Sequence, residues 1–261
     1  MSTYKVIAAL GSSFAAGPGI EPVVDQGAMR SGMNYAHQLS ERLGAELVDL
    51  TVSGATTANV IDTPQDTGTG SPTAPQLDSV PEHADVVTIT AGGNDLQFAG
   101  AMLFVAWQRL EPDSPMASLL GGMFSGGIPE PTTADIERAT EGLVRVIEAT
   151  RARAPRCRVI LVDYLTVLDQ GSLDHTPFSA DELAQFLTIQ TAIGTVFTDA
   201  ATRTGAELAR ASALSQGHAL GSAEPWVQPF HQDMTRTAGS FHPNEAGMTA
   251  IAVELERMLQ N

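Results

Sequence analysis

The sequence predicts an α/β protein in which a parallel sheet is covered by helices on both faces. Short apolar runs typical of buried strands alternate along the chain with longer amphipathic segments typical of helices. The segments between the strands are too long for hairpins, which favours crossover connections between parallel strands. The sequence shows no internal repeat and no heptad pattern that would indicate a solenoid or a coiled coil.

Length and composition indicate one domain with a sizeable core. The chain has 261 residues without an obvious linker, so we expect a single domain over residues 1–261. Hydrophobic residues make up 43%, and no apolar run is long enough to cross a bilayer. The single cysteine, Cys157, precludes an internal disulfide and fits a reducing compartment. Residues 1–5 leave no room for a signal peptide, so we expect a cytoplasmic protein, although a trimmed export signal would leave the same sequence.

The charge of the chain restricts its partners. The formal net charge is −16, which argues against nucleic acid, because nucleic-acid binding needs basic surface to displace counterions. No two histidines have the spacing of a zinc-binding helix, so we expect neither a metal nor another cofactor. These observations leave a small-molecule substrate as the expected partner, and the oligomeric state stays open.

Five strands are expected in the sheet, each as a short run of mainly aliphatic and β-branched residues. They span residues 6–10, 45–50, 86–90, 158–164 and part of 206–214. Four helices are expected between and after them: residues 34–43 ending at Gly44, 133–153 capped by Thr133, 179–204 with a Ser179–Glu182 capping box, and 244–255.

One region departs from this alternation. Residues 96–110 are apolar almost all round, and the following residues 111–131 carry four glycines and four prolines. We expect residues 111–131 to form a long irregular loop insertion. Long loops inside compact domains are usually functional or disordered. This one is either an ordinary insertion or a mobile rim over an apolar pocket.

Four short motifs coincide with strand ends or with the start of the last helix. Gly11-Ser12-Ser13 follows the first strand, Ser53-Gly54 the second, Gly92-Gly93-Asn94-Asp95 the third, and His242-Pro243-Asn244 precedes the last helix. Open α/β sheets bind ligands outside the carboxyl ends of their strands. We therefore expect these motifs to meet at one edge of the sheet.

Together the motifs supply the groups that acyl transfer needs. Ser13 is the candidate nucleophile, because a hydroxyl can form and break an acyl bond once a base takes its proton. His242 is the candidate base, which later acts as the acid. The amide N–H groups of Ser13 and Gly54 and the side-chain amide of Asn94 would stabilise the oxyanion.

In order and spacing these motifs resemble those of the SGNH hydrolase family, the GDSL-type esterases and lipases. The resemblance extends from Tyr4 to Leu259, and residues 53–57 and 225–227 are similar to those of bacterial lipase-like members. It implies a flavodoxin-like three-layer α/β/α sandwich, here with a five-stranded parallel sheet. It also implies hydrolysis of carboxylic esters.

Two positions depart from the family pattern. Ser12 stands where the family usually has an aspartate before the nucleophile, and a serine can still form a local hydrogen bond. Gly239 stands where the family has an aspartate three residues before the histidine. Another acceptor must then hold the imidazole tautomer. We expect a Ser-His dyad oriented by a main-chain carbonyl, with that of Gly239 the nearest candidate, whereas Asp233 is an alternative without geometric support.

Three functions remain open at this point. A serine esterase or lipase acting on small or medium acyl esters is favoured. The same site would also serve an acyltransferase or a carbohydrate deacetylase, and the missing aspartate motivates a non-catalytic binding protein. For an esterase, the apolar side chains of Phe104, Trp107, Met123 and Phe124 would line an acyl pocket.

Overall fold

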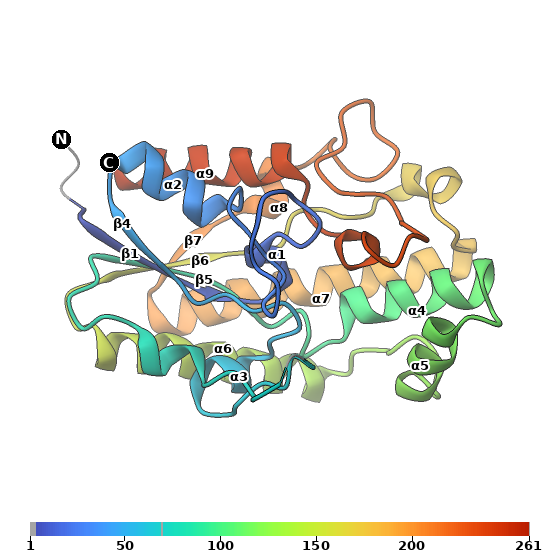
Figure 1. Cartoon of the computed structure of the whole chain (residues 1–261), viewed down its shortest axis with the longest axis horizontal. Helices are drawn as coiled ribbons and strands as arrows, with labels where there is room; N and C mark the ends of the chain where they lie inside the picture. Colours follow the sequence, from blue (N-terminus) through green and yellow to red (C-terminus); the bar gives the residue numbers. More distant parts are fainter. Residues whose placement is uncertain (1–3, 69, 261) are drawn as a thin grey trace.

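The computed structural model describes residues 4–68 and 70–260 (Figure 1). Within these residues, five parallel strands form the central sheet in the order β4–β1–β5–β6–β7. They are β1 (Val6–Gly11), β4 (Glu46–Asp49), β5 (Val86–Thr90), β6 (Arg158–Val162) and β7 (Glu207–Ala209). All five predicted strands are therefore present, in the 2-1-3-4-5 order of flavodoxin-like sheets. The prediction for residues 1–3 lies outside the described residues.

Strand β1 lies inside the sheet and is buried on both faces. It pairs in parallel with β4 through Ile7 opposite Leu47, and with β5 through Ala8 opposite Val87. Each of its residues is buried, as is each residue of β5. This burial explains why the strands appear in the sequence as continuous apolar runs rather than alternating ones.

Helices cover both faces of the sheet and give the predicted three layers. The α2 helix (Tyr35–Leu43) and the α9 helix (Glu245–Leu259) pack together on one face, whereas α3 (Thr57–Ile61), α6 (Thr133–Arg153) and α7 (Ala180–Thr204) cover the other. The α4 helix (Phe98–Leu110) and the α5 helix (Pro115–Met123) extend beyond the carboxyl ends of the strands (Figure 1). These two helices therefore form a wall beside the edge of the sheet where the motifs are expected to meet.

The capping predictions hold with one correction. Asn34 caps α2 by accepting hydrogen bonds from the amides of residues 36 and 37, and Ser179 with Glu182 forms the capping box of α7. Thr132, not Thr133, caps α6, because its hydroxyl accepts from the amide of Asp135 while the Asp135 carboxylate accepts from the Thr132 amide. The sequence placed this cap one residue too late.

The connections contain elements that the sequence did not predict. Residues 111–131 were expected to be irregular, but Ser114 caps α5 within them, with Pro115 at the first helical position. The loop after Ser13 contains a short α1 helix (Ser13–Ala16) and an antiparallel ribbon of β2 (Val23–Asp25) and β3 (Arg30–Ser31). Smaller elements are α8 (Ala211–Leu214) and 3₁₀ turns at Gln76–Ser79, Gln170–His175 and Thr237–Gly239. Among the described residues, no helix combines the length and apolar character needed to cross a membrane.

Candidate active site

The backbone at the end of β1 is held in an unusual conformation that presents Ser13. Gly11 has φ +144°, and a Cβ at this position would overlap the Thr90 carbonyl of β5, so a side chain is not tolerated here. The buried Gln76 side chain bonds both backbone groups of Gly11, accepting from its N–H at 2.8 Å and donating to its C=O at 2.9 Å. Ser13 then opens α1 at the topological switch point between β1 and β5.

Ser13 and His242 come together across 229 residues of sequence. The Ser13 Oγ lies 2.7 Å from Nε2 of His242, and the imidazole is only 4% exposed. The other ring nitrogen, Nδ1, lies 2.8 Å from the main-chain carbonyl oxygen of Ser240. A neutral imidazole that donates from Nδ1 to this carbonyl has Nε2 free to accept the serine proton.

The orienting carbonyl belongs to Ser240, so the prediction of Gly239 is wrong. The Gly239 carbonyl instead accepts the backbone N–H of His242. Phe241 has φ +63°, a left-handed conformation that is rare for an aromatic residue. The chain bends sharply at Phe241, and the carbonyl two residues before the histidine faces the ring.

Asp233, the alternative partner of the imidazole, has other contacts. Its carboxylate accepts the Thr235 amide at 2.9 Å and the Thr235 hydroxyl at 2.8 Å. These bonds lower the pKa of Asp233 below its ordinary value, since they stabilise the ionised form. Its role in the structure is to stabilise the turn that carries residues 234–238.

Burial dominates the electrostatics of the imidazole. Desolvation lowers the pKa of His242 to about 4, and the opposing hydrogen bond to the Ser240 carbonyl is the smaller influence. The ring is therefore neutral at pH 7, which is the form that a general base requires.

The predicted oxyanion groups lie around the same cavity. Ser13, Gly54 and Asn94 all line it together with His242. One N–H of the Asn94 side chain donates to the Ala55 carbonyl at 2.8 Å, which fixes the amide plane and leaves its second N–H for a ligand. The amide of Ser13 belongs to the first turn of α1, where a helix offers its N–H groups no internal acceptor.

Asp95 connects the third motif to α3. Its carboxylate accepts the Thr57 hydroxyl at 2.6 Å and the Thr57 amide at 3.1 Å. A carboxylate at a helix N-terminus is favourable because it meets unpaired N–H groups and the positive end of the helix dipole. Asp95 therefore anchors the loop of Asn94 to the neighbouring segment that carries Gly54.

Tyr164 is a site residue that the sequence analysis did not single out. Its hydroxyl lies 2.9 Å from Ser12 Oγ, and its ring stacks on Phe14 with centroids 4.0 Å apart. A Cβ at Gly93 would overlap the Tyr164 ring, so this glycine packs directly against it. Tyr164 thus contacts the residues adjacent to Ser13 and to Asn94. It follows β6, and a polar residue at the carboxyl end of a central strand was the only signal in the sequence.

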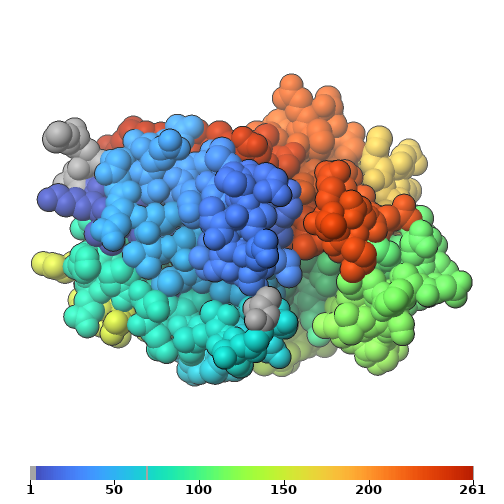
Figure 2. Space-filling model, in the orientation of Figure 1, coloured from blue at the N-terminus to red at the C-terminus, as the bar shows by residue number. Residues whose placement is uncertain are grey.

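The cavity at Ser13 is large and mainly apolar. Its volume is about 810 Å³, and Figure 2 shows a hollow on this face between the early blue segment, the green α4–α5 segment and the orange-red loop near residue 235. Beyond Ser13, His242 and the predicted oxyanion groups, one side of the cavity is formed by six residues of α4 and α5: Ala99, Gly100, Leu103, Trp107, Met116 and Leu120.

Only one of the four predicted acyl-pocket residues lines this cavity. Trp107 does so, and its indole N–H also donates to the Thr237 hydroxyl at 3.1 Å across the cavity. Phe104 and Phe124 stack on each other outside it, 5.5 Å apart, and Met123 faces solvent. The reason is the geometry of the helix. Leu103 and Trp107 are four residues apart and lie on the same face, whereas Phe104 is one residue after Leu103 and lies about 100° further around the helix axis.

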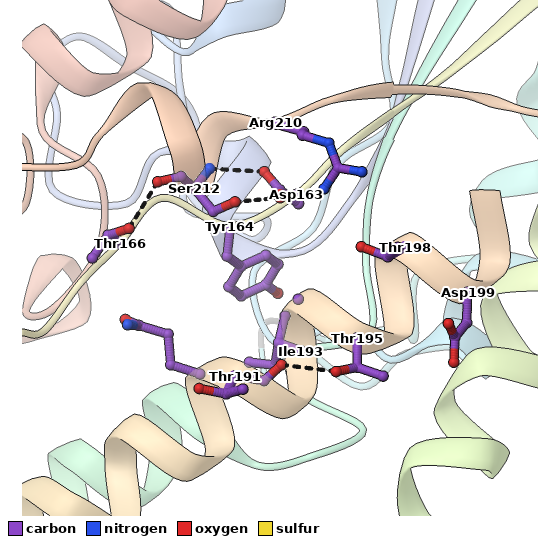
Figure 3. Close-up of a pocket in the computed structure, with 12 residues that line it drawn as sticks. Asp163, Tyr164, Thr166, Thr191, Ile193, Thr195, Thr198, Asp199, Arg210 and Ser212 are labelled. Carbon is purple, nitrogen blue, oxygen red and sulfur yellow. Dashed lines mark hydrogen bonds between the residues drawn. The ribbon is translucent and has the colours of Figure 1, made fainter. Parts of the chain in front are cut away.

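A second cavity lies behind Tyr164, between β6, the α8 segment and α7 (Figure 3). It measures about 420 Å³ and is lined mainly by polar side chains, including Thr191, Thr195 and Arg210. The buried Asp163 carboxylate accepts the Ser212 hydroxyl at 2.6 Å in its wall, and burial raises the pKa of Asp163. Neither Ser13 nor His242 borders this cavity, so it is separate from the candidate active site.

Comparisons with known proteins place the chain in a family. The sequence profile of the GDSL-like lipase/acylhydrolase family matches residues 9–250. The chain is 31% identical to Lipase 2 of Streptomyces coelicolor over 256 residues, covering 94% of this chain and 82% of the relative.

Two solved structures share the fold at lower identity. They are an extracellular lipase from Streptomyces rimosus (TM-score 0.67, 21% identity, 97% of this chain and 99% of the other) and a phospholipase A1 from Streptomyces albidoflavus (TM-score 0.66, 18% identity, 95% and 96%). With the profile match over nearly the whole chain, these findings show that the protein belongs to the GDSL-like lipase/acylhydrolase family and is an SGNH-type hydrolase.

Proposed function

We propose that the protein hydrolyses carboxylic esters with an extended acyl chain through an acyl-enzyme on Ser13. The observation that carries this proposal is the 2.7 Å contact between Ser13 Oγ and His242 Nε2 at a cavity lined by the apolar residues of α4 and α5. A nucleophile bonded to a base that is oriented by a third group is the arrangement that serine acyl transfer uses.

Acylation begins with attack of Ser13 Oγ on the ester carbonyl carbon, while the hydroxyl proton passes to Nε2 of His242. The electron pair of the carbonyl π bond moves to oxygen, and the N–H groups of Ser13, Gly54 and Asn94 stabilise this oxyanion. The tetrahedral intermediate then collapses. The C–O bond to the leaving group breaks, and the departing oxygen takes the proton from His242 and leaves as an alcohol.

Deacylation repeats these steps with water as the nucleophile. Water gives a proton to Nε2 of His242 and adds to the acyl carbon, and collapse breaks the bond to Ser13 Oγ, which recovers its proton from the imidazole. The low pKa of His242, about 4, keeps the base neutral between turnovers. The charged imidazolium is transient and gains support from the Ser240 carbonyl at 2.8 Å.

The shape of the cavity favours an extended acyl chain over an acetyl group. Leu103, Trp107 and Leu120 present an apolar side that a short acyl group would leave uncovered. Burial of each additional methylene contributes about 0.8 kcal/mol, so longer chains should bind more tightly until the cavity is full.

Labelling with a fluorophosphonate probe tests the nucleophile. We expect one labelled serine in the wild type and none in Ser13→Ala, while the matched variant Ser12→Ala is still labelled. Labelling lost in Ser12→Ala and retained in Ser13→Ala would place the nucleophile one residue earlier.

A graded series of p-nitrophenyl esters tests the substrate class. We expect kcat/KM to rise from the acetate to longer acyl chains, and a maximum at acetate would favour a deacetylase instead. Adding competing alcohols and identifying the products separates hydrolysis from acyl transfer, since an acyltransferase would form the new ester in preference to the free acid.

A further inference from the structure

Exposed apolar side chains are concentrated around the mouth of the Ser13 cavity. Of the nine large hydrophobic residues that are exposed among the described residues, six lie on the three segments that border this mouth. They form what we call the rim: Val23, Val24, Met29, Leu119, Met123 and Met234. Val23, Met29 and Met234 line the cavity themselves. Single exposed hydrophobic residues are normal on proteins, but a cluster around a pocket indicates an interaction surface.

The α5 part of the rim lacks the usual polar outer face. No charged residue occurs from residue 114 to residue 129. The inner face of α5 contacts the core through Ala117 and Leu120, whereas Leu119 is 60% and Met123 66% exposed on the outer face. The nearby α6 has the ordinary pattern, with exposed Arg138 and Glu141 on its solvent side. Apart from Ser118, the helix carries no polar side chain, and a helix with apolar residues on both faces is expected where both faces are covered.

The place of the rim restricts what can cover it. A folded partner or a second copy of the chain seated on the rim would close the cavity that contains Ser13 and His242. A lipid aggregate differs, because its own molecules can move from the covered surface into the cavity. Three of the six rim residues are methionines, whose flexible side chains adapt to irregular apolar surfaces.

The charge of the chain selects among lipid surfaces. With a net charge of −16, the protein is repelled by anionic lipid, and that repulsion grows as the surface becomes more negative. A lipid surface without net charge allows the same apolar contact without this electrostatic repulsion.

We propose that the rim binds the surface of a lipid aggregate without net charge, which presents ester substrate directly to the Ser13 cavity. This inference rests on the proposed ester hydrolysis and specifies how substrate reaches the site. The rim residues insert between headgroups, and an acyl chain passes from the aggregate into the cavity beside α4 and α5.

Vesicles of diether phosphatidylcholine provide a binding test that is independent of turnover, since ether lipids contain no ester to cleave. We compare the wild type with Leu119→Ser/Met123→Ser in a flotation assay. Loss of two exposed apolar side chains should lower the apparent affinity about tenfold or more. The matched control is Leu214→Ser/Val253→Ser, which removes two exposed apolar residues from α8 and α9 and should bind like the wild type.

Two further measurements separate the possible outcomes. Hydrolysis of a soluble monomeric ester should be equal in the wild type and in Leu119→Ser/Met123→Ser, because neither residue lines the cavity. Replacing part of the phosphatidylcholine with a diether phosphatidylglycerol should weaken binding of the wild type. Absent vesicle binding, equal loss in the α8–α9 control, or a dimer that only the rim variant disperses would each overturn the rim proposal. Absence of hydrolysis of any ester by the wild type would instead overturn the proposed function.

Discussion

The sheet edge that carries the candidate site and the wall formed by α4 and α5 border the same cavity, but their residues could be predicted from the sequence to different degrees. At the edge, Ser13, Gly54 and Asn94 follow three strands and border one cavity, as the sequence predicts. On the wall, only Trp107 of the predicted residues lines the cavity. Positions fixed by strand ends are therefore easier to derive than positions fixed by the rotation of a packed helix.

The two regions also differ in how they are held. The edge is held by polar contacts between the motifs and segments distant in the sequence, such as Gln76 to Gly11, Asp95 to Thr57 and Tyr164 to Ser12. The wall depends on apolar packing, exemplified by the stacking of Phe104 on Phe124. We therefore expect changes at the edge to lower the rate sharply, whereas changes in the wall should alter substrate preference.

The largest expected effect distinguishes a dyad from a triad. His242→Ala should lose nearly all activity, whereas Asp233→Asn should keep most of it, because the Asp233 carboxylate bonds Thr235 and the imidazole bonds the Ser240 carbonyl. In a carboxylate triad the corresponding Asp→Asn change costs about 10⁴ in kcat. The measurement is kcat with circular dichroism as a folding control, and a collapse in Asp233→Asn would replace the dyad with a triad.

Removal of one oxyanion donor should have the next largest effect. Asn94→Ala should lower kcat by roughly 10²–10³ with little change in KM, since the donor acts on charge that develops only in the transition state. The variant also loses the hydrogen bond to the Ala55 carbonyl, so its thermal midpoint is measured in parallel. A rate equal to that of the wild type would exclude Asn94 from the mechanism.

The pH profile tests the burial of the base. Because burial lowers the pKa of His242 from 6.5 to about 4, the neutral imidazole persists as the pH falls, and kcat/KM should decline only near pH 4. An exposed imidazole with its ordinary pKa of about 6.5 would be about 25-fold less active at pH 5 than at pH 7. The unfolded chain binds this proton more readily, so His242 also lowers stability as the pH falls from 6.5 toward 4. An acid limb at 6.5 in protein that is still folded contradicts this expectation.

Tyr164 should have a smaller effect, confined to positioning. Tyr164→Phe keeps the ring on Phe14 and removes the hydroxyl contact to Ser12, a bond worth about 1 kcal/mol. We expect kcat to fall a few-fold with KM unchanged. Because Ser12→Ala breaks the same contact, the double variant should lose no more than either single variant. Additive losses would show that the two residues act separately.

The smallest expected effect is on substrate preference rather than on rate. Met116→Trp places a larger side chain in the cavity and should shift the preferred p-nitrophenyl ester toward shorter acyl chains, with the rate on the shortest ester within a few-fold of the wild type. Phe104→Leu is the matched control on α4, because Phe104 was predicted to line the pocket but packs against Phe124 outside it. If Phe104→Leu changed the preferred acyl-chain length as much as Met116→Trp does, the preference would depend on the packing of α4 against α5 rather than on the residues that line the cavity.

The sequence by itself determined the layers of the fold and the edge that carries the candidate site. Parallel strands place their carboxyl ends together whatever the details of packing, so a serine after β1 and an asparagine after β5 had to lie near each other. The helix caps at Asn34 and Ser179 were equally accessible, because a cap bonds amides only two or three residues away.

Three features were decided only by the tertiary structure. One is the carbonyl that bonds His242, and another is the face of α4 that borders the cavity. The third is the contact of Tyr164 with both Ser12 and Gly93. The carbonyl depends on the left-handed backbone at Phe241, which no residue type in the motif demands. The face of α4 depends on how an almost wholly apolar helix rotates against its neighbours, and its own sequence has too weak a polar side to fix that rotation. Contacts between residues far apart in sequence are set by packing, and packing is a property of the whole chain.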